Sequence, residues 1–226
     1  MTNISQIRSG KKVYSYEEII IQLTKSAVIY NNYVDKDILF VYFIPTLQEY
    51  KHHIVSFRKS SFAHLTGFNI NTRNSTSKSA FFERCLDNNL DEEYLVQFTH
   101  NKKTVSQKLS VLPSLLNYHN CSIYRIGQKD TITQYNKFQV GLIYTDGLLG
   151  FSNSSCDYHN ILFPTTTMLC QGSDYITEPY RISLVFEKNA QVKMPYTLVY
   201  AIKKGLAYQD LKPELPQDLL NIIVCK

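Results

Sequence analysis

Apolar residues recur at helical spacing along the first half of the chain. Residues 16–30 have such a stripe, follow the N-capping residue Ser15 and begin with two acids in the first turn. These signals predict a helix with one buried face. The same periodicity predicts three further helices, over 77–86, 91–98 and 103–118. Pro113 is expected to kink or divide the last of them, because proline removes a helix hydrogen bond.

Shorter apolar runs predict strands. Residues 38–44 are too few and too rich in β-branched and aromatic side chains for a buried helix, and Pro45 follows them, so we expect a central strand. A second strand is predicted over 53–57. After Cys121 short runs broken by Gly, Asn and Asp predict strands over 121–126, 138–145, 148–152, 158–162, 180–187 and 196–203. Thr145-Asp146-Gly147 predicts a hairpin turn in which Gly147 supplies the positive φ.

This order of elements predicts an α+β fold, in which N-terminal helices pack on one face of a twisted, mainly antiparallel sheet. A chain of 226 residues is expected to form a single domain. Its predicted parts are an N-terminal arm (1–14), a mainly helical part with one or two strands (15–120), an antiparallel sheet (121–210) and a C-terminal tail (211–226) with a short helix over 217–223.

The composition indicates a globular protein without a membrane segment. Hydrophobic residues make up 44% of the chain and aromatic residues 13%, which is enough for a core. The longest apolar run, 38–44, is far shorter than the roughly 20 residues that cross a bilayer. No cationic start followed by an apolar stretch and a cleavage site opens the chain, so we expect a cytoplasmic protein.

The cysteines predict neither disulfides nor a metal centre. Their number is five, they are widely separated, and no Cys-x-x-Cys pair occurs, so we expect reduced thiols. One alternative is a zinc site with four ligands from Cys156-Asp157-Tyr158-His159 and Cys170, but their spacing matches no common zinc motif. We therefore predict no metal and no cofactor.

Positive charge is concentrated in one segment. The formal net charge is +5, and residues 101–140 carry six cations against the single acid Asp130. The six are Lys102, Lys103, Lys108, Arg125, Lys129 and Lys137. A basic segment on an otherwise neutral chain predicts an anionic partner, nucleic acid first. A solvated helix face rich in lysine would have the same composition.

Residues 57–68 hold the densest chemistry of the chain. His64 is accompanied there by Arg58, Lys59, Ser61 and Thr66. Metal-free cleavage of RNA needs a group that takes the proton of the 2′-hydroxyl and cations that stabilise the crowded phosphate, and these side chains supply both. The same residues would also bind a phosphate without cleaving it, and an amphipathic turn with a structural histidine is the simplest alternative.

Later stretches carry groups that we expect at the same cleft. They are Thr165 after a proline, Arg181 at a strand start, and Tyr200 with Lys203 at a strand end. Arg181 would clamp a phosphate or pair with Glu178 or Glu187. His52-His53 lacks a carboxylate at metal-site spacing, and no paired acids typical of two-metal nucleases occur. A metal-independent ribonuclease is therefore favoured over a magnesium-dependent DNase.

The order of short motifs resembles one family. The motifs are Phe-x-His-Leu-Thr-Gly at 62–67, Phe-Phe-x-x-Cys at 81–85, Lys-Leu-x-Val-Leu at 108–112, Pro-x-Thr at 164–166, Tyr-Arg-Ile at 180–182 and, loosely, Tyr-x-x-Lys-Gly at 200–205. This set is similar to the phage and mobile-element members of the barnase, EndoU, colicin E5/D and RelE-like superfamily, specifically the fourth phage-associated nuclease family. The resemblance covers roughly residues 15–210.

The resemblance implies an α+β fold and a metal-independent RNA endonuclease, a toxin-like effector of a phage or mobile element that acts in the cytoplasm of the bacterial host cell. It assigns the catalytic residues His64, Thr66, Tyr200 and Lys203. With the basic residues noted above, it predicts phosphate or RNA contacts at Arg58, Lys59, Ser61, Thr165, Arg181, Lys102, Lys103 and Lys108. RNA is the expected partner, with an antitoxin or host protein as a second. The alternative is a non-catalytic module of the same fold that binds RNA or a host protein.

Overall fold

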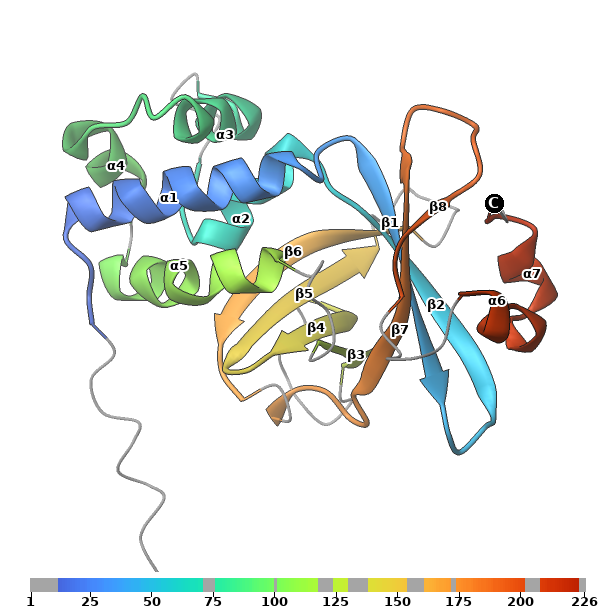
Figure 1. The fold of residues 1–226 in the computed structure, drawn as a ribbon. Helices are drawn as coiled ribbons and strands as arrows, with labels where there is room; N and C mark the ends of the chain where they lie inside the picture. Colours follow the sequence, from blue (N-terminus) through green and yellow to red (C-terminus); the bar gives the residue numbers. More distant parts are fainter. Residues whose placement is uncertain are drawn as a thin grey trace, which may run out of the picture.

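A computed structural model describes residues 12–70, 76–99, 101–117, 124–129, 138–153, 161–171, 174–201 and 208–223 (Figure 1). The helices are α1 (Tyr16–Asn31), α2 (Phe62–Thr66), α3 (Lys78–Leu86), α4 (Glu92–Phe98), α5 (Lys102–Leu116), α6 (Tyr208–Leu211) and α7 (Gln217–Leu220), with single 3-10 turns η2 (Lys59–Ser61) and η6 (Lys212–Glu214). The strands are β1 (Lys36–Ile44), β2 (Glu49–Ser56), β3 (Arg125–Gln128), β4 (Val140–Tyr144), β5 (Gly147–Asn153), β6 (Ile161–Leu169), β7 (Tyr180–Asn189) and β8 (Thr197–Ala201).

The predicted helices are confirmed, and so is the predicted cap at Ser15. The Ser15 hydroxyl accepts a hydrogen bond from the backbone N–H of Glu18, whose carboxylate accepts one from the N–H of Ser15, so a reciprocal capping box starts α1. Side chains of Ser77, Asp91 and Asn101 cap α3, α4 and α5 in the same position. These caps satisfy N–H groups that the first turn leaves unpaired.

Helix α5, in which we expected a kink or a division at Pro113, runs through this proline without dividing. Proline removes one N–H donor and disturbs one turn, whereas the helix buries a continuous apolar stripe against its neighbours. That stripe consists of Val105, Leu109, Leu112, Leu115 and Leu116. Burial of five large side chains outweighs the loss of one hydrogen bond.

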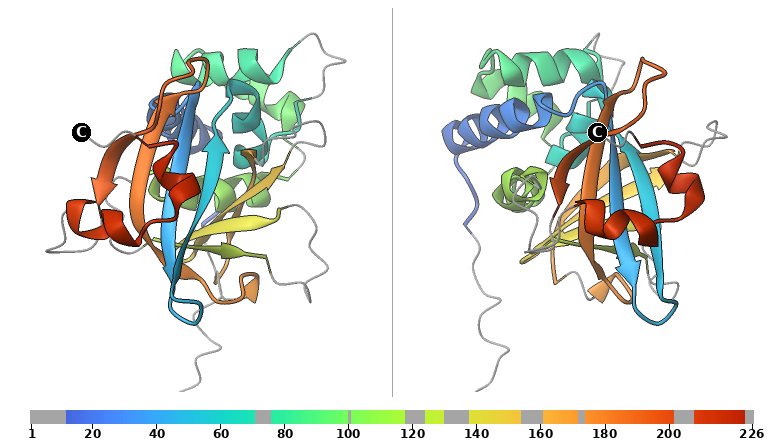
Figure 2. Two further views of the ribbon diagram at one scale, coloured as in Figure 1. Left: turned by 90° about the vertical axis from the view of Figure 1, so that its right-hand side faces the viewer. Right: turned by 45° about the vertical axis from the view of Figure 1, so that its right-hand side comes forward.

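The sheet is mainly antiparallel, as predicted. The strand order is β1-β2-β6-β5-β4-β3-β7-β8, and β1 also pairs with β7, so β1 is central. Among the described strands β2 and β6 form the parallel pair, and the other pairs are antiparallel. The β1–β7 pairing curls the sheet back on itself, which Figure 2 shows from two sides. The α+β class is thereby confirmed.

Strand β1 is apolar from Ile38 to Ile44 because both of its faces are covered. Phe40 and Tyr42 point into the larger core, which α1, α3 and α5 complete, while Leu39 and Val41 point into a second core under the C-terminal helices. Figures 1 and 2 show α1 to α5 on one side of the sheet and α6 and α7 on the other. The N-terminal helices therefore lie on one face, as predicted, and α6 is an additional element.

Strand β6 continues beyond the predicted range of 158–162 and includes Thr165, Thr166 and Thr167. It runs from Ile161 to Leu169 with Pro164 inside it. Opposite it on β5, Phe151 pairs with Pro164 and Gly150 with Thr166, so Thr165 is the extra residue of a bulge. Proline lacks a donor for the ladder and is tolerated at bulges, which explains why the strand continues through it.

The β4–β5 turn differs from the prediction. Tyr144 pairs with Gly147, so Thr145 and Asp146 form the turn, and the positive φ of 46° belongs to Thr145. The prediction that Gly147 supplies it is wrong. Gly147 is needed for a different reason: a Cβ atom there would lie 3.0 Å from Cδ1 of Leu115. The missing side chain lets α5 pack closely on β5.

Candidate functional site

Helix α2 presents His64 at the surface and buries the residues around it. Phe62, Ala63 and Leu65 lie in the main core, whereas His64 is exposed. Gly67 ends the helix in the left-handed conformation with φ 86°. Glycine reaches this conformation without the steric cost of a Cβ atom. The short helix is therefore fixed by its apolar side and its C-cap, and its one exposed position carries the imidazole.

Two lysines from different helices hold His64. Nζ of Lys78, at the start of α3, lies 2.8 Å from Nε2 of His64. Nζ of Lys108, on α5, donates to the backbone carbonyl of His64 at 3.0 Å. The aliphatic stem of Lys108 passes over Gly67, where a Cβ atom would lie 3.0 Å from its Cδ. An imidazole and two ammonium groups thus form one cluster, which we call the His64 cluster.

The His64 cluster favours a neutral imidazole. Partial burial of the ring lowers the pKa of His64 below its usual value, and the charges of Lys78 and Lys108 lower this pKa further. An ammonium group has only donors, so Nε2 accepts from Lys78 and the ring proton sits on Nδ1. At neutral pH the imidazole of His64 is therefore an uncharged base, and the lone pair of its Nε2 accepts the hydrogen bond from Lys78.

Thr66 lies beside His64 in sequence but not at the surface. Its side chain is fully buried, and Oγ1 donates to the carbonyl of Ala63 at 2.9 Å. This hydroxyl completes the last turn of α2 from inside. The position of Thr66 fits a residue that shapes the helix, not one that contacts substrate.

The cations before α2 have different surroundings. The Arg58 guanidinium is exposed and stacks over the buried ring of Phe163 on β6, 4.0 Å from its centroid. Lys59 instead forms an ion pair with Glu83 on α3 at 2.8 Å. Burial raises the pKa of Tyr30 strongly, and the side chain of the half-buried Ser61 is hydrogen-bonded to that tyrosine. Among Arg58, Lys59 and Ser61, Arg58 is the residue that carries an exposed cationic group stacked on an aromatic ring.

Strand β6 lies next to this region, whereas β8 does not. Helix α2 contacts β6, and the bulge residue Thr165 on β6 is half-buried and donates to the carbonyl of Gly150 at 3.2 Å. Tyr200 is on β8, opposite Val185 of β7. Strands β2, β1 and β7 separate β6 from β8 in the sheet. The topology therefore sets Tyr200 apart from α2, and Lys203 lies outside the described residues.

The remaining predicted cations are spread over the surface. Lys102 and Lys103 are at the start of α5, where Nζ of Lys102 lies 3.8 Å from the centroid of the Tyr16 ring. Lys103 is exposed. Arg181 is exposed on β7 and lies directly opposite Arg125 of β3. The basic segment thus contributes Lys108 to the His64 cluster, while its other described members lie elsewhere.

A second histidine, His53, belongs to a partly buried stack of rings. Oη of Tyr42 lies 3.0 Å from Nε2 of His53, and Tyr42 stacks on His53 and on Tyr180 with centroid distances of 5.5 and 5.8 Å. Desolvation, reinforced by the neighbouring His52, lowers the pKa of His53 to about 4. The alternation of β2, which turns His53 toward the core face of β1, is the signal that would have found this group.

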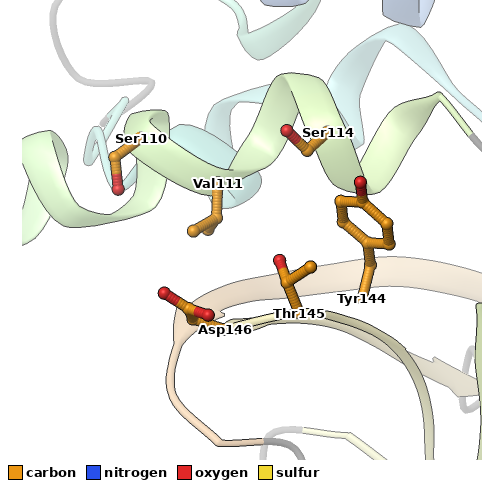
Figure 3. Close-up of a pocket in the computed structure, with 6 residues that line it drawn as sticks. All are labelled: Ser110, Val111, Ser114, Tyr144, Thr145 and Asp146. Atoms are coloured by element: carbon orange, nitrogen blue, oxygen red, sulfur yellow. The ribbon is translucent and has the colours of Figure 1, made fainter.

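A small pocket lies between α5 and the β4–β5 turn. It holds about 230 Å³ and is lined by Ser110, Val111, Ser114, Tyr144, Thr145 and Asp146. Figure 3 shows hydroxyl groups from both sides and the Asp146 carboxylate around it. None of the predicted catalytic residues lines it.

The described residues contain neither a cluster of metal ligands nor a helix that could cross a membrane. No group of three or more His, Cys, Asp or Glu side chains is arranged to hold a metal ion in that part of the chain. Cys170 is a half-buried free thiol, while Cys156 and His159 lie outside the described residues. None of the described helices combines the length and the apolar character needed to span a bilayer.

Comparison with known proteins gives one match. The sequence profile described as phage-Barnase-EndoU-ColicinE5/D-RelE like nuclease4 matches residues 22–204. Neither a curated protein nor a solved structure gave a match. The matched range runs from α1 through β8 and includes the His64 cluster. The chain therefore belongs to this family of phage-associated nucleases.

Proposed function

We propose that this nuclease is a metal-independent RNA endonuclease whose proton-transfer group is His64. The observation that carries the proposal is the 2.8 Å contact between Nε2 of His64 and Nζ of Lys78. It joins a neutral base to a phosphate-binding cation at the surface of a nuclease fold. Lys108, bound to the His64 carbonyl, adds a second cation beside the base.

In the proposed reaction the substrate phosphate replaces Nε2 of His64 as the partner of Lys78. A phosphate anion attracts an ammonium group more strongly than a neutral imidazole does. Nε2 is then free to take the proton of the 2′-hydroxyl, whose oxygen attacks phosphorus. The bond from phosphorus to the 5′-oxygen breaks, the leaving oxygen takes a proton from water, and the imidazolium returns its proton to water. The products are a 2′,3′-cyclic phosphate and a 5′-hydroxyl end.

Arg58 is the next group in this proposal. Its guanidinium stacks on Phe163 beside α2, where its planar fork can donate to two oxygens of a phosphate. Thr165 lies on the neighbouring part of β6, and Lys103 is exposed at the start of the helix that carries Lys108. We assign these residues to binding of the RNA backbone around the cleaved bond.

The test is cleavage of unstructured and structured RNA by the full chain in EDTA. Wild type is expected to produce 2′,3′-cyclic phosphate ends, and His64→Gln is expected to lose cleavage by at least about 100-fold, a typical contribution of acid–base catalysis. His52→Gln is the matched control and should cleave normally. Absence of cleavage by wild type, or full cleavage by His64→Gln, would overturn the proposal.

We further propose that the protein acts as an effector in the cytoplasm of a bacterial host, as the phage-associated family name suggests. Production of wild type in bacterial cells should arrest growth, and His64→Gln should relieve the arrest. An antitoxin or a host protein is the corresponding partner. Equal growth with both proteins would contradict the role as a toxin.

A non-catalytic RNA-binding module is the second candidate. Burial of Thr66 and the distance in the sheet between Tyr200 and α2 favour it, because both leave His64 without the predicted hydroxyl partners. In this case RNA would bind with steep salt dependence and remain intact. The same incubation in EDTA therefore separates the two candidates.

A further inference from the structure

Two arginines lie directly opposite each other where β3 meets β7. The pairing between these strands consists of Arg125 with Arg181 and Ile126 with Tyr180. Directly opposed residues of an antiparallel pair point to the same face, with Cβ atoms about 5 Å apart. Both arginines are exposed. The two guanidinium groups therefore project side by side from one face of the sheet.

Arg125 and Arg181 project from the outer face of the sheet, which is the face away from the main core. Ile126 and Tyr180 pack in the main core, so their neighbours Arg125 and Arg181 point away from it. On the next strand Ile143 is opposite Arg125, and it belongs to the small outer cluster around Ile176. The arginine pair thus borders an apolar patch on the side of the sheet that faces away from the main core.

The acids closest in sequence to Arg181 are engaged elsewhere. The carboxylate of Glu178 accepts a hydrogen bond from the hydroxyl of Tyr180 at 2.6 Å. The carboxylate of Glu187 forms an ion pair with Lys36 at 3.1 Å. Within the described part of the chain no carboxylate forms an ion pair with either arginine of the pair. Like charges directly opposite each other destabilise a sheet, so this pair favours an anion between them.

The backbone beneath the pair is closely packed. A Cβ atom on Gly127 would lie 2.7 Å from Cγ2 of Ile176 and 3.3 Å from Cα of Pro179. The segment before β7 is therefore pressed against β3 through the absent side chain of Gly127. A pair held on a fixed backbone loses little freedom when it binds a ligand.

We propose that Arg125 and Arg181 together clamp one phosphate group of a bound RNA strand, at a subsite distinct from the His64 cluster. Guanidinium groups bind phosphate oxygens in a bidentate way, and two of them on one phosphate replace their mutual repulsion with attraction. The choice of RNA rests on the proposed function, whereas the phosphate chemistry rests on the arginine pair alone.

The main experiment measures binding of a 2′-O-methyl RNA oligonucleotide, which cannot be cleaved through its 2′ position, to the full chain over a range of salt. Arg125→Gln and Arg181→Gln are each expected to weaken binding about fivefold. The double variant is expected to lower the slope of log affinity against log salt by about one unit, as for one lost phosphate contact. Arg84→Gln is the matched control, because Arg84 is also exposed and stacks on Tyr94 of α4.

Three outcomes would overturn the clamp on RNA. A slope lowered by about two units in the double variant would mean two separate phosphate contacts. Affinities equal to that of Arg84→Gln would mean no contact at all. Inorganic phosphate that raises the melting temperature of wild type but not of Arg181→Gln, with RNA affinity unchanged, would assign the pair to a small phosphate ligand. Because the oligonucleotide is not cleaved, failure of His64 chemistry affects none of these measurements.

Discussion

Nζ of Lys78 lies 2.8 Å from Nε2 of His64, although the two residues belong to different helices. Because the ammonium group can only donate, the contact exists while the imidazole is neutral, and it ends when the imidazole is protonated. The same ammonium therefore keeps the base uncharged and occupies its lone pair. An arriving phosphate would remove this block by binding the ammonium.

This relationship predicts the effect of Lys78→Met on the pKa of His64. Loss of the positive charge and of the hydrogen bond to the neutral ring should raise that pKa toward its ordinary value, about 6.5. An NMR titration of the imidazole measures it directly. Lys59→Met is the control, because Lys59 pairs with Glu83 and should leave the His64 titration unchanged. A His64 pKa that stays the same in Lys78→Met would show that the contact is not made in solution.

Gly67 links the stability of α2 to the position of Lys108. Gly67→Ala should lower the free energy of unfolding by about 1–2 kcal/mol, because an L-residue at φ 86° is strained. Gly67→Asn should cost less, since asparagine tolerates this conformation. Both side chains bring a Cβ atom to 3.0 Å from Cδ of Lys108, so both should displace that lysine from the His64 carbonyl.

Denaturant unfolding and RNA cleavage of the two Gly67 variants separate these effects. The difference in stability between Gly67→Ala and Gly67→Asn reports backbone strain, while a loss of cleavage shared by both reports displacement of Lys108. If Gly67→Ala unfolds at the same denaturant concentration as wild type, the left-handed C-cap is not required.

Local signals in the sequence predicted most of the fold. Ser15, Ser77 and Asp91 mark helix starts because their side chains satisfy N–H groups a few residues away. Residues 38–44 are apolar on both faces, which identifies a central strand. The continuation of β6 through Pro164 was not predicted, and Gly147 was misread, because these features depend on a bulge opposite β5 and on the approach of α5, which are contacts between distant segments.

The site was predicted less completely for the same reason. His64 stands out by its neighbours in sequence, but Lys78 joins it from α3, 14 residues further along the chain. Tyr200 follows a strand pattern correctly, yet the order of strands in the sheet, which sequence periodicity does not encode, separates it from α2. The pairing of Arg125 with Arg181 across β3 and β7 likewise depends on the register between two strands that are far apart in the chain.

His53 should make the stability of the protein depend on pH. Its pKa is about 4 in the folded protein, below the ordinary 6.5, so between these values the unfolded chain binds a proton that the folded chain does not. The free energy of unfolding should therefore be greatest above pH 6.5 and fall as the pH drops toward 4. The contribution of this one group is at most about 3 kcal/mol.

Unfolding in urea at several pH values tests the role of His53. In His53→Gln the free energy of unfolding should change less between pH 6.5 and pH 4 than in wild type. This holds even if the substitution lowers stability at every pH. His52→Gln should also reduce this dependence on pH, because burial lowers the pKa of His52 as well. A slope in His53→Gln as steep as in wild type would assign the pH dependence to other groups.

Arg58 should act through its planar shape as well as its charge. Its guanidinium lies 4.0 Å from the Phe163 ring centroid, so the stack holds the fork beside α2 before RNA arrives. Arg58→Lys retains the charge but loses the stack and the bidentate geometry, whereas Arg58→Gln loses all three. Because Arg58 is assigned to binding, both substitutions should raise KM with little change in kcat, and Gln more than Lys. Arg84→Gln, which removes an exposed arginine that stacks on Tyr94 and has no assigned role in RNA binding, is the control for loss of charge alone. If Arg58→Lys cleaves RNA with the KM of wild type, charge suffices and the stack on Phe163 is structural; if Arg58→Gln does so too, Arg58 does not contact the substrate.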